Sequence, residues 1–271
     1  MKLLVQGDDF GITKGCTYGI IEGIENGLVR NSGLFSNMPS APFAAEYMKK
    51  HPGFCWGIDI NVVCGRPVSD PAEIPALVDD KGNFLKSGTI ISNPEFATAE
   101  GRRKLFPLDQ CYREVRAQYD RFVELTGFKP NYINGHSIVH ENLIEAFRQL
   151  GKEEHLNFTM DIWQHYGLRH CPVEKGDNST ASLKKVFNAE EQLNCHPVNG
   201  ILDNKEECLG YDIMLIACHP GFLDPELLDY TSLSIRRIRE YEMVTSPELM
   251  QWVKENEIEL ITYRDLPYFE V

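Results

Sequence analysis

Short apolar runs alternate along the chain with segments in which apolar residues recur at helical spacing. The run at residues 3–5 is followed by the segment 16–26, where Ile20, Ile21 and Ile24 have that spacing. Such alternation is typical of a parallel sheet with helices on its faces. We therefore expect further strands near residues 33–38, 55–63, 131–134, 156–162, 211–218 and 258–262, and helices over 43–50, 111–126, 143–150 and from Ser246.

Length and charge narrow the class of protein. The chain has 271 residues, 42% of them hydrophobic, and no repeat or linker divides it, so we expect one domain over residues 1–271. A net charge of −13 opposes binding to nucleic acid or an anionic membrane, which leaves small molecules as the expected partners. The eight cysteines form no C-x-x-C pair, and no leader or membrane span is recognised, which indicates a cytoplasmic protein. A homodimer is compatible with an acidic cytoplasmic protein of this type.

Two adjacent carboxylates, Asp8 and Asp9, end the first apolar run. Gly7 and Gly11 on either side allow the backbone to turn tightly there. Neighbouring aspartates repel each other unless a cation, a proton or a hydrogen-bond network holds them. Taken alone, the pair is more often an Asp-Gly turn with a helix cap than a functional site.

Acidic or imidazole side chains also lie in or after three other expected strands. Asp59 lies within 55–63, His136 follows 131–134, and His219 follows 211–218. The carboxyl ends of the strands of a β/α barrel meet at one face, where such enzymes carry out catalysis. An open doubly wound sheet would gather only two or three of these groups. We therefore expect an α/β fold with a single, TIM-barrel-like (β/α) barrel.

The combination of carboxylates and imidazoles favours a divalent cation at that face. Both are ordinary metal ligands, and a cation would offset the repulsion between Asp8 and Asp9. A single histidine is more often a structural hydrogen-bonding group, so the argument depends on the placement of His136 and His219 after strands.

Two long segments have little periodicity. Residues 65–107 are rich in Pro, Gly and Asp, which predicts long loops or a lid near the site. Residues 171–209 are polar and irregular, and we expect a surface excursion there with an exposed turn at Asp177, Asn178 and Ser179.

Five motifs are spread over the chain: Gly7-Asp8-Asp9-Phe10-Gly11, residues 57–62, residues 134–140, Cys218-His219-Pro220 and residues 237–246. In content and order they resemble the YdjC-like carbohydrate deacetylases, the group that contains chitooligosaccharide deacetylase, over essentially the whole chain. The family patterns are, in the same order, Ala-Asp-Asp-Phe-Gly, Gly-x-His-x-x-Leu, Asp-Ser-His-His-His-Val-His, Cys-His-Pro and Arg-x-x-Glu-x-Glu-x-x-Thr-Ser.

The resemblance implies a metal-dependent hydrolase that removes N-acetyl groups from small N-acetylated oligosaccharides, such as chitobiose or its phosphate. Asp8 would be the general base and His219 the general acid. Asp9 and His136 would be ligands of one divalent metal ion.

The resemblance also implies two residues that line the substrate pocket, His140 and Arg237. His136 and His140 are similar to the His-Ser-x-x-His motif of polysaccharide deacetylases, which makes His140 a reserve metal ligand. Arg237 could meet a substrate phosphate, but a surface salt bridge to Glu240 is an equally good interpretation.

Two positions depart from the family pattern. Asp59 stands where the family has a metal-binding histidine, and Asn134 stands where it has an aspartate. Asp59 can still coordinate, and a site with two carboxylates and one imidazole favours magnesium or manganese over zinc, although zinc stays possible. Asn134 lacks the charge that would orient a ligand histidine. We expect weakened deacetylation with a changed metal, or another substrate or reaction.

Two further functions fit the same residues. The first is hydrolysis of another bond in a disaccharide phosphate, for which Asp8 and Asp59 could flank a glycosidic bond without a metal. The second is sugar binding by a protein whose catalysis has weakened. The presence of Asp8 and His219 argues against a purely binding role, because binding requires neither.

Overall fold

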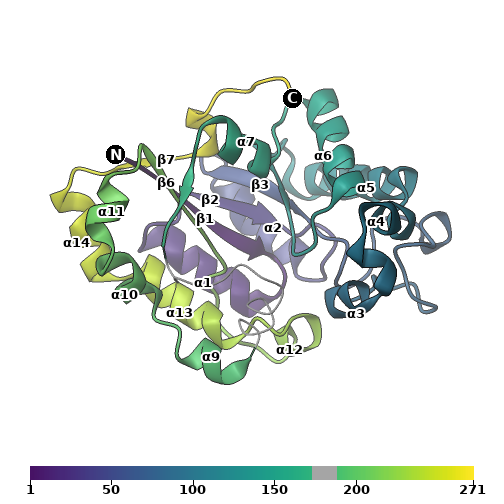
Figure 1. Cartoon of the computed structure of the whole chain (residues 1–271), viewed down its shortest axis with the longest axis horizontal. Coiled ribbons are helices and arrows are strands. Elements are labelled where there is room, and N and C mark those ends of the chain that lie inside the picture. The colour runs from purple at the N-terminus through teal and green to yellow at the C-terminus, as the bar shows by residue number, and fades with distance from the viewer. Residues whose placement is uncertain (173–187) are drawn as a thin grey trace.

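A computed structural model describes residues 1–172 and 188–271 and contains one parallel sheet (Figure 1). Seven strands form it in the described residues, in the order β4-β3-β2-β1-β6-β5, and β7 also pairs with β1. Every pairing is parallel, so the carboxyl ends of the strands lie at one edge. The strands are β1 (Lys2–Phe10), β2 (Asn31–Leu34), β3 (Cys55–Ile60), β4 (Ile133–Gly135), β5 (Arg169–His170), β6 (Ile213–Cys218) and β7 (Glu259–Ile261).

Helices connect the strands and cover the sheet. In Figure 1, α5 and α6 lie toward one end of the molecule and α13 and α14 toward the other. The helices are α1 (Lys14–Glu25), α2 (Ala41–Lys50), α3 (Ser87–Ser92), α4 (Ala99–Leu105), α5 (Leu108–Thr126), α6 (Glu141–Glu154), α7 (Thr159–His165), α9 (Ala189–Leu193), α10 (Pro197–Leu202), α11 (Lys205–Leu209), α12 (Leu227–Tyr230), α13 (Ile235–Val244) and α14 (Pro247–Glu255). Short 3-10 turns are η1 (Pro71–Glu73), η2 (Pro94–Ala97) and η3 (Tyr263–Asp265).

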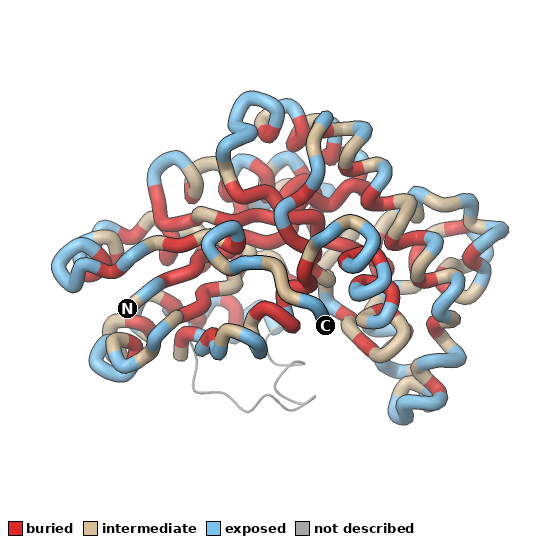
Figure 2. The backbone as a smooth tube through the Cα atoms, turned by 90° about the horizontal axis from the view of Figure 1, so that it is seen from above, coloured by how far each residue is buried: buried red, intermediate tan, exposed pale blue. Residues whose placement is uncertain are grey.

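Strand β1 lies at the centre of the sheet. It pairs with β6 over Lys2 to Gly7, with β7 over its first residues and with β2 over its last. All of its residues after Lys2 are buried, which is typical of a strand covered on both faces. Figure 2 shows this buried centre surrounded by exposed connecting segments.

The closed TIM-like barrel is not confirmed. In the described residues the strand path ends at β4 and β5, which do not pair with each other, so the sheet is a partial barrel. Part of the reason lies at residues 156–162, where the predicted strand is wrong. Only Phe158 there makes a bridge, to Ile133, and the chain then turns into α7. The Asp161 carboxylate in α7 pairs with Arg148 of α6 at 2.6 and 3.0 Å, which ties that helix to its neighbour.

The segment 65–107 is more ordered than predicted. It contains η1, α3, η2 and α4 instead of only loops. None of these helices exceeds two turns, so none gives a sustained periodic signal. Asn93 and Thr98 cap η2 and α4 through their side-chain oxygens. Lys86 Nζ donates to the carbonyl of Asp229 at 3.2 Å, which joins this segment to α12.

The polar region 171–209 is also partly helical. Its residues from 188 onward form the short helices α9, α10 and α11, where an irregular excursion was predicted. The predicted turn at Asp177, Asn178 and Ser179 lies outside the described residues. Helix α13 was not predicted, whereas α14 begins as expected, with Ser246 Oγ accepting from the Leu249 amide at 3.2 Å.

Of the four clusters of buried apolar residues in the described part of the chain, the largest lies beneath α2, α5 and α6 and the second largest between β1, β6, α13 and α14. All eight cysteines are buried. Across residues 1–172 and 188–271, every helix is too short or too polar to cross a lipid bilayer.

Gly57 in β3 gives a test of this packing. A Cβ at Gly57 would lie 2.3 Å from two ring carbons of Tyr132, so Gly57→Ala should lower the free energy of unfolding by about 1–3 kcal/mol. Gly53→Ala is the control, because no atom lies within 4 Å of its Cβ position, and it should change stability by less than about 0.5 kcal/mol. Urea denaturation measures both, and equal stability of the two variants would contradict this packing.

Candidate active site

A bulge at the end of β1 turns two neighbouring carboxylates toward one region. Gly7 is paired with Ser32 and Phe10 with Leu34, so Asp8 and Asp9 both lie opposite one residue of β2. Asp9 has φ 70°, in the left-handed region that aspartate tolerates better than most residues. Successive side chains of a regular strand point to opposite faces, and the bulge removes this alternation.

Asp9 is held by a buried ion pair with Arg237 of α13. Both side chains are fully buried, and Arg237 Nη2 donates to Asp9 Oδ2, while Arg237 Nε donates to the Leu233 carbonyl at 2.8 Å. Burial alone would raise the pKa of Asp9, but Arg237 and the adjacent His136 outweigh it and hold the pKa well below its usual range. Asp9 is therefore the ionised member of the pair.

Asp8 receives two hydrogen bonds on the same oxygen. Gln6 Nε2 donates to Asp8 Oδ1 at 2.5 Å, and Asn134 Nδ2 donates to it at 3.3 Å. No donor of the described residues reaches Oδ2, and Asp8 as a whole is 7% exposed. Burial, with smaller contributions from Asp9 and Glu240, raises the pKa of Asp8 well above its usual value.

Asp59 and Asn134 are register partners on β3 and β4. Asn134 Nδ2 donates to Asp59 Oδ1 at 3.1 Å, and the Asp9 amide donates to Asp59 Oδ2 at 3.2 Å. Burial, followed by the charges of Asp8 and Asp9, raises the pKa of Asp59 well above its usual value. Asn134 thus bridges two carboxylates, a role that the sequence did not predict.

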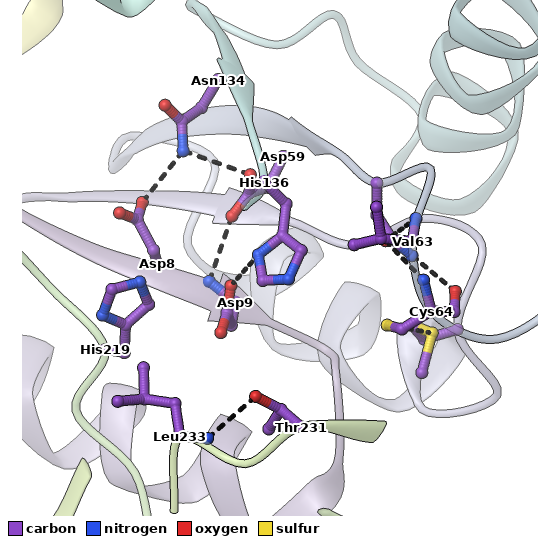
Figure 3. A network of polar contacts seen from close by, with 12 residues as sticks. Asp8, Asp9, Asp59, Val63, Cys64, Asn134, His136, His219, Thr231 and Leu233 are labelled. Carbon is purple, nitrogen blue, oxygen red and sulfur yellow. Dashed lines mark hydrogen bonds and ion pairs between the residues drawn. The ribbon is translucent and has the colours of Figure 1, made fainter. Parts of the chain in front are cut away.

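His136 follows β4 and lies beside Asp9 (Figure 3). His136 Nδ1 lies at ion-pair distance, 3.0 Å, from Asp9 Oδ1, but the two groups are not aligned for a regular hydrogen bond, and no other donor of the described residues reaches this buried oxygen. Two neighbouring ligands of an octahedral cation such as Mg²⁺, each about 2.1 Å from it, lie roughly 3 Å apart. Asp9 Oδ1 and the adjacent imidazole therefore fit a divalent cation.

A complete metal site is not formed by the side chains alone. Across the part of the chain that the structure describes, no group of three Asp, Glu, His or Cys residues is arranged to hold a metal ion. Of the three predicted ligands, Asp9 and His136 come together, whereas both oxygens of Asp59 already accept hydrogen bonds. Each carboxylate oxygen has a second lone pair, so Asp59 keeps the capacity to coordinate.

His219 follows β6 and is held by a buried glutamate. Its amide donates to Glu240 Oε2 at 2.5 Å, and its ring Nδ1 lies 3.4 Å from the same oxygen, while Arg236 Nε donates to Oε1 at 2.7 Å. Burial alone would lower the pKa of His219, but Glu240 raises it above its usual value, and the pKa of Glu240 is about 2. Figure 3 shows Asp8 between His219 and Asn134.

The two residues predicted to line the substrate pocket, Arg237 and His140, are both buried and have different surroundings. Arg237 is fully buried and pairs with Asp9, so the predicted surface salt bridge to Glu240 is wrong. His140 is buried with its ring 4.1 Å from that of Phe106, and burial lowers its pKa to about 4. Neither ring nitrogen of His140 has a hydrogen-bond partner in the described residues, and its substrate-binding role stays a prediction.

Sequence reasoning missed Gln6 and the role of Glu240. The signal for Gln6 was available, because residues two apart on a strand share a face and Gln6 precedes Asp8 by two. Glu240 follows Arg236 by four residues, the spacing of neighbours on a helix, but its contact with His219 requires the packing of α13 against β6.

The pair of His219 and Glu240 predicts a pH-dependent stability. The raised pKa of His219 stabilises the folded state below pH 6.5, and this contribution is lost as the pH rises through the folded-state pKa. The lowered pKa of Glu240 stabilises the folded state above pH 4.5, and this contribution is lost as the pH falls toward about 2. The stability deficit of Glu240→Gln should therefore be largest between pH 4.5 and 6.5, and NMR titration should show a lower His219 pKa.

The exposed Glu242 in the same helix pairs with Arg239 and provides the control Glu242→Gln, which should show little deficit at any pH. A Glu240→Gln deficit that is the same at pH 6 and at pH 9, by urea denaturation, would contradict the pairing.

Comparison with known proteins shows the family and the fold of this chain. Residues 2–255 match the family model described as YdjC-like protein. A carbohydrate deacetylase of Clostridium beijerinckii is 31% identical over 98% of this chain and 100% of its own length, and carbohydrate deacetylase 2 of Listeria innocua is 30% identical over 98% and 99%. A solved structure from Enterococcus faecalis V583, named for a proposed role in cellobiose-phosphate cleavage, superposes with a TM-score of 0.75 at 23% identity and covers 98% of both chains, which shows a shared fold. The chain therefore belongs to the YdjC-like protein family.

Proposed function

We propose that this protein is a metal-dependent carbohydrate deacetylase, which hydrolyses the N-acetyl group of a small oligosaccharide such as chitobiose or its phosphate. The relatives named carbohydrate deacetylase support the substrate class. The observation that carries the proposal is the pairing of a base and an acid at one edge of the sheet. Asp8 has one oxygen that no donor of the described residues reaches, and His219 is held by Glu240.

Asp8 is the general base. Its Oδ1 is occupied by two amide donors, so Oδ2 is the atom that takes a proton from the attacking water. Burial raises the pKa of Asp8, and a carboxylate base is more effective when its pKa is closer to neutrality.

His219 is the general acid. Glu240 stabilises the imidazolium, and Nδ1 faces Glu240, which leaves Nε2 to donate a proton to the departing sugar amine. The side chain of His219 is 31% exposed and that of His136 15%, whereas Asp9 is fully buried, so a substrate reaches the site past the two imidazoles.

Asp9 and His136 would hold one divalent cation, with Asp59 as the third protein ligand. The chemistry that such an ion supplies when bound is polarisation of the acetyl carbonyl and acidification of water. Among the described residues, the buried carboxylates of Asp8, Asp9 and Asp59 lie near the buried guanidinium of Arg237, and a bound cation would favour the ionised forms of these carboxylates. Two carboxylates and one imidazole favour magnesium or manganese, with zinc as the third candidate.

A glycosidase mechanism receives less support. It requires two carboxylates about 5–9.5 Å apart on either side of the scissile bond. Asn134 Nδ2 donates to both Asp8 and Asp59, at 3.3 and 3.1 Å, so a protein amide fills the space between these carboxylates. A purely sugar-binding role would need neither the free oxygen of Asp8 nor the glutamate behind His219.

Acetate release is the first test. Protein stripped of metal should release acetate from diacetylchitobiose only after manganese, magnesium or zinc is added, and Asp8→Asn should lower kcat by roughly 10²–10⁴-fold because the proton acceptor is lost. The exposed Asp80→Asn is the control and should keep wild-type kcat. Absence of release with every ion, from folded protein, would refute the proposed reaction.

Metal preference tests the role of Asp59. Asp59→His exchanges a hard carboxylate for an imidazole, so the ratio of zinc affinity to magnesium affinity should rise, as measured by titration calorimetry. Asp59→Asn is the matched variant, and it should weaken magnesium without a gain for zinc. An unchanged affinity ratio in Asp59→His would show that residue 59 does not bind the ion.

A further inference from the structure

A chain of buried hydrogen bonds leads from the C-terminal part of the molecule to Asp8. Trp163 Nε1 of α7 donates to Tyr263 Oη at 2.8 Å. Tyr263, in η3 after β7, donates its hydroxyl proton to Gln6 Oε1. Gln6 Nε2 then donates to Asp8 Oδ1 at 2.5 Å. Gln6 and Tyr263 are both buried, so these bonds are shielded from water.

The direction of this chain is set by its first member. An indole N–H can only donate, so the Tyr263 oxygen accepts from Trp163 and its single proton is left for Gln6. The carbonyl end of the Gln6 amide therefore faces Tyr263, and its NH₂ end faces Asp8. The flipped amide would place Oε1 against the Asp8 carboxylate and leave the Tyr263 proton without an acceptor.

A second, shorter chain acts on the same oxygen. Thr159 Oγ1 donates to Asn134 Oδ1 at 2.7 Å, which turns Asn134 Nδ2 toward Asp8 and Asp59. Both Gln6 and Asn134 thus present N–H groups to Asp8 Oδ1 from different strands.

We propose that Gln6, Tyr263 and Trp163 are positioning residues that hold the Asp8 carboxylate in one orientation, with Oδ1 occupied and Oδ2 presented to the reacting water. This inference rests on the proposed role of Asp8 as the base. None of the three residues touches substrate in this account. These residues increase the fraction of time in which Asp8 Oδ2 is oriented toward the reacting water. Their loss should therefore lower kcat more than it changes KM.

A set of matched substitutions separates positioning from packing. Tyr263→Phe removes the central hydroxyl, Trp163→Phe removes the donor that sets the direction, and Gln6→Met removes the donor to Asp8 at similar size. Tyr166→Phe is the control, because the Tyr166 hydroxyl donates to the Pro267 carbonyl at 2.6 Å in the same region without reaching Asp8.

Kinetics of acetate release from diacetylchitobiose, with metal added, give the first readout. We expect Tyr263→Phe and Trp163→Phe to lower kcat by about tenfold to a hundredfold, with KM within about twofold of wild type and Tyr166→Phe unchanged. The double variant Gln6→Met/Tyr263→Phe should be no slower than Gln6→Met, because Tyr263 acts through Gln6. Multiplicative losses in the double variant, or an equal loss in Tyr166→Phe, would overturn the proposal.

The side-chain amide protons of Gln6, assigned by NMR through Gln6→Met, give a readout that does not need activity. In the wild type the chemical shifts of these protons should differ from those of exposed glutamines, and their exchange with solvent should be slower. Tyr263→Phe and Trp163→Phe should abolish both differences, whereas Tyr166→Phe should not. Unchanged Gln6 signals in both variants would contradict the proposal that Trp163 and Tyr263 orient Gln6. If wild-type protein releases no acetate, the proposed reaction is refuted. The Gln6 signals then test only whether Trp163 and Tyr263 orient Gln6.

Discussion

The placement of buried negative charge beside one buried guanidinium is the constraint on which the site depends. Asp9 and Arg237 are both fully buried, and removal of either partner would leave an isolated charge in the interior. Arg237 must therefore stay close to the end of β1, which ties α13 to the centre of the sheet. The Arg237 carbonyl also accepts from the Gly221 amide at 3.2 Å, so the segment after β6 that carries His219 is held by the same helix.

The same region uses backbone irregularity to bring two neighbouring acids to one side. The bulge and the left-handed conformation of Asp9 give the adjacent carboxylates different environments. Arg237 lowers the pKa of Asp9, whereas burial raises that of Asp8. Two aspartates adjacent in sequence therefore have opposite protonation tendencies, which suits one as a permanent anion and the other as a group that exchanges protons.

The two departures from the family pattern form one structural unit. Asp59 and Asn134 are opposite each other in the register of β3 and β4, and the amide of Asn134 donates to the carboxylate of Asp59. The resemblance given by the sequence motifs implies a histidine and an aspartate at these positions, whereas here the amide of Asn134 is the donor and the carboxylate of Asp59 the acceptor. A carboxylate at both positions would place another charge beside Asp8 and Asp9, which the neutral Asn134 avoids.

The sequence by itself determined the parallel α/β class, the order of most strands and helices, and the set of polar residues at the ends of β1, β3, β4 and β6. These follow from local periodicity, because a buried strand must be apolar up to the point where it reaches the edge of the sheet. Local pattern failed at residues 156–162 and 65–107, where helices of one or two turns depend on contacts such as that of Asp161 with Arg148.

Only the tertiary structure decided which of those polar residues meet and with which partners. The bulge at Asp8 and Asp9, the burial of Arg237 against Asp9, the bridge from Asn134 and the orientation of Gln6 by Tyr263 all join residues far apart in the chain. The open edge between β4 and β5 is equally a property of the assembled sheet. Periodicity reports which face a residue occupies, whereas the pairing of buried polar atoms depends on strand register and helix placement, which local sequence does not contain.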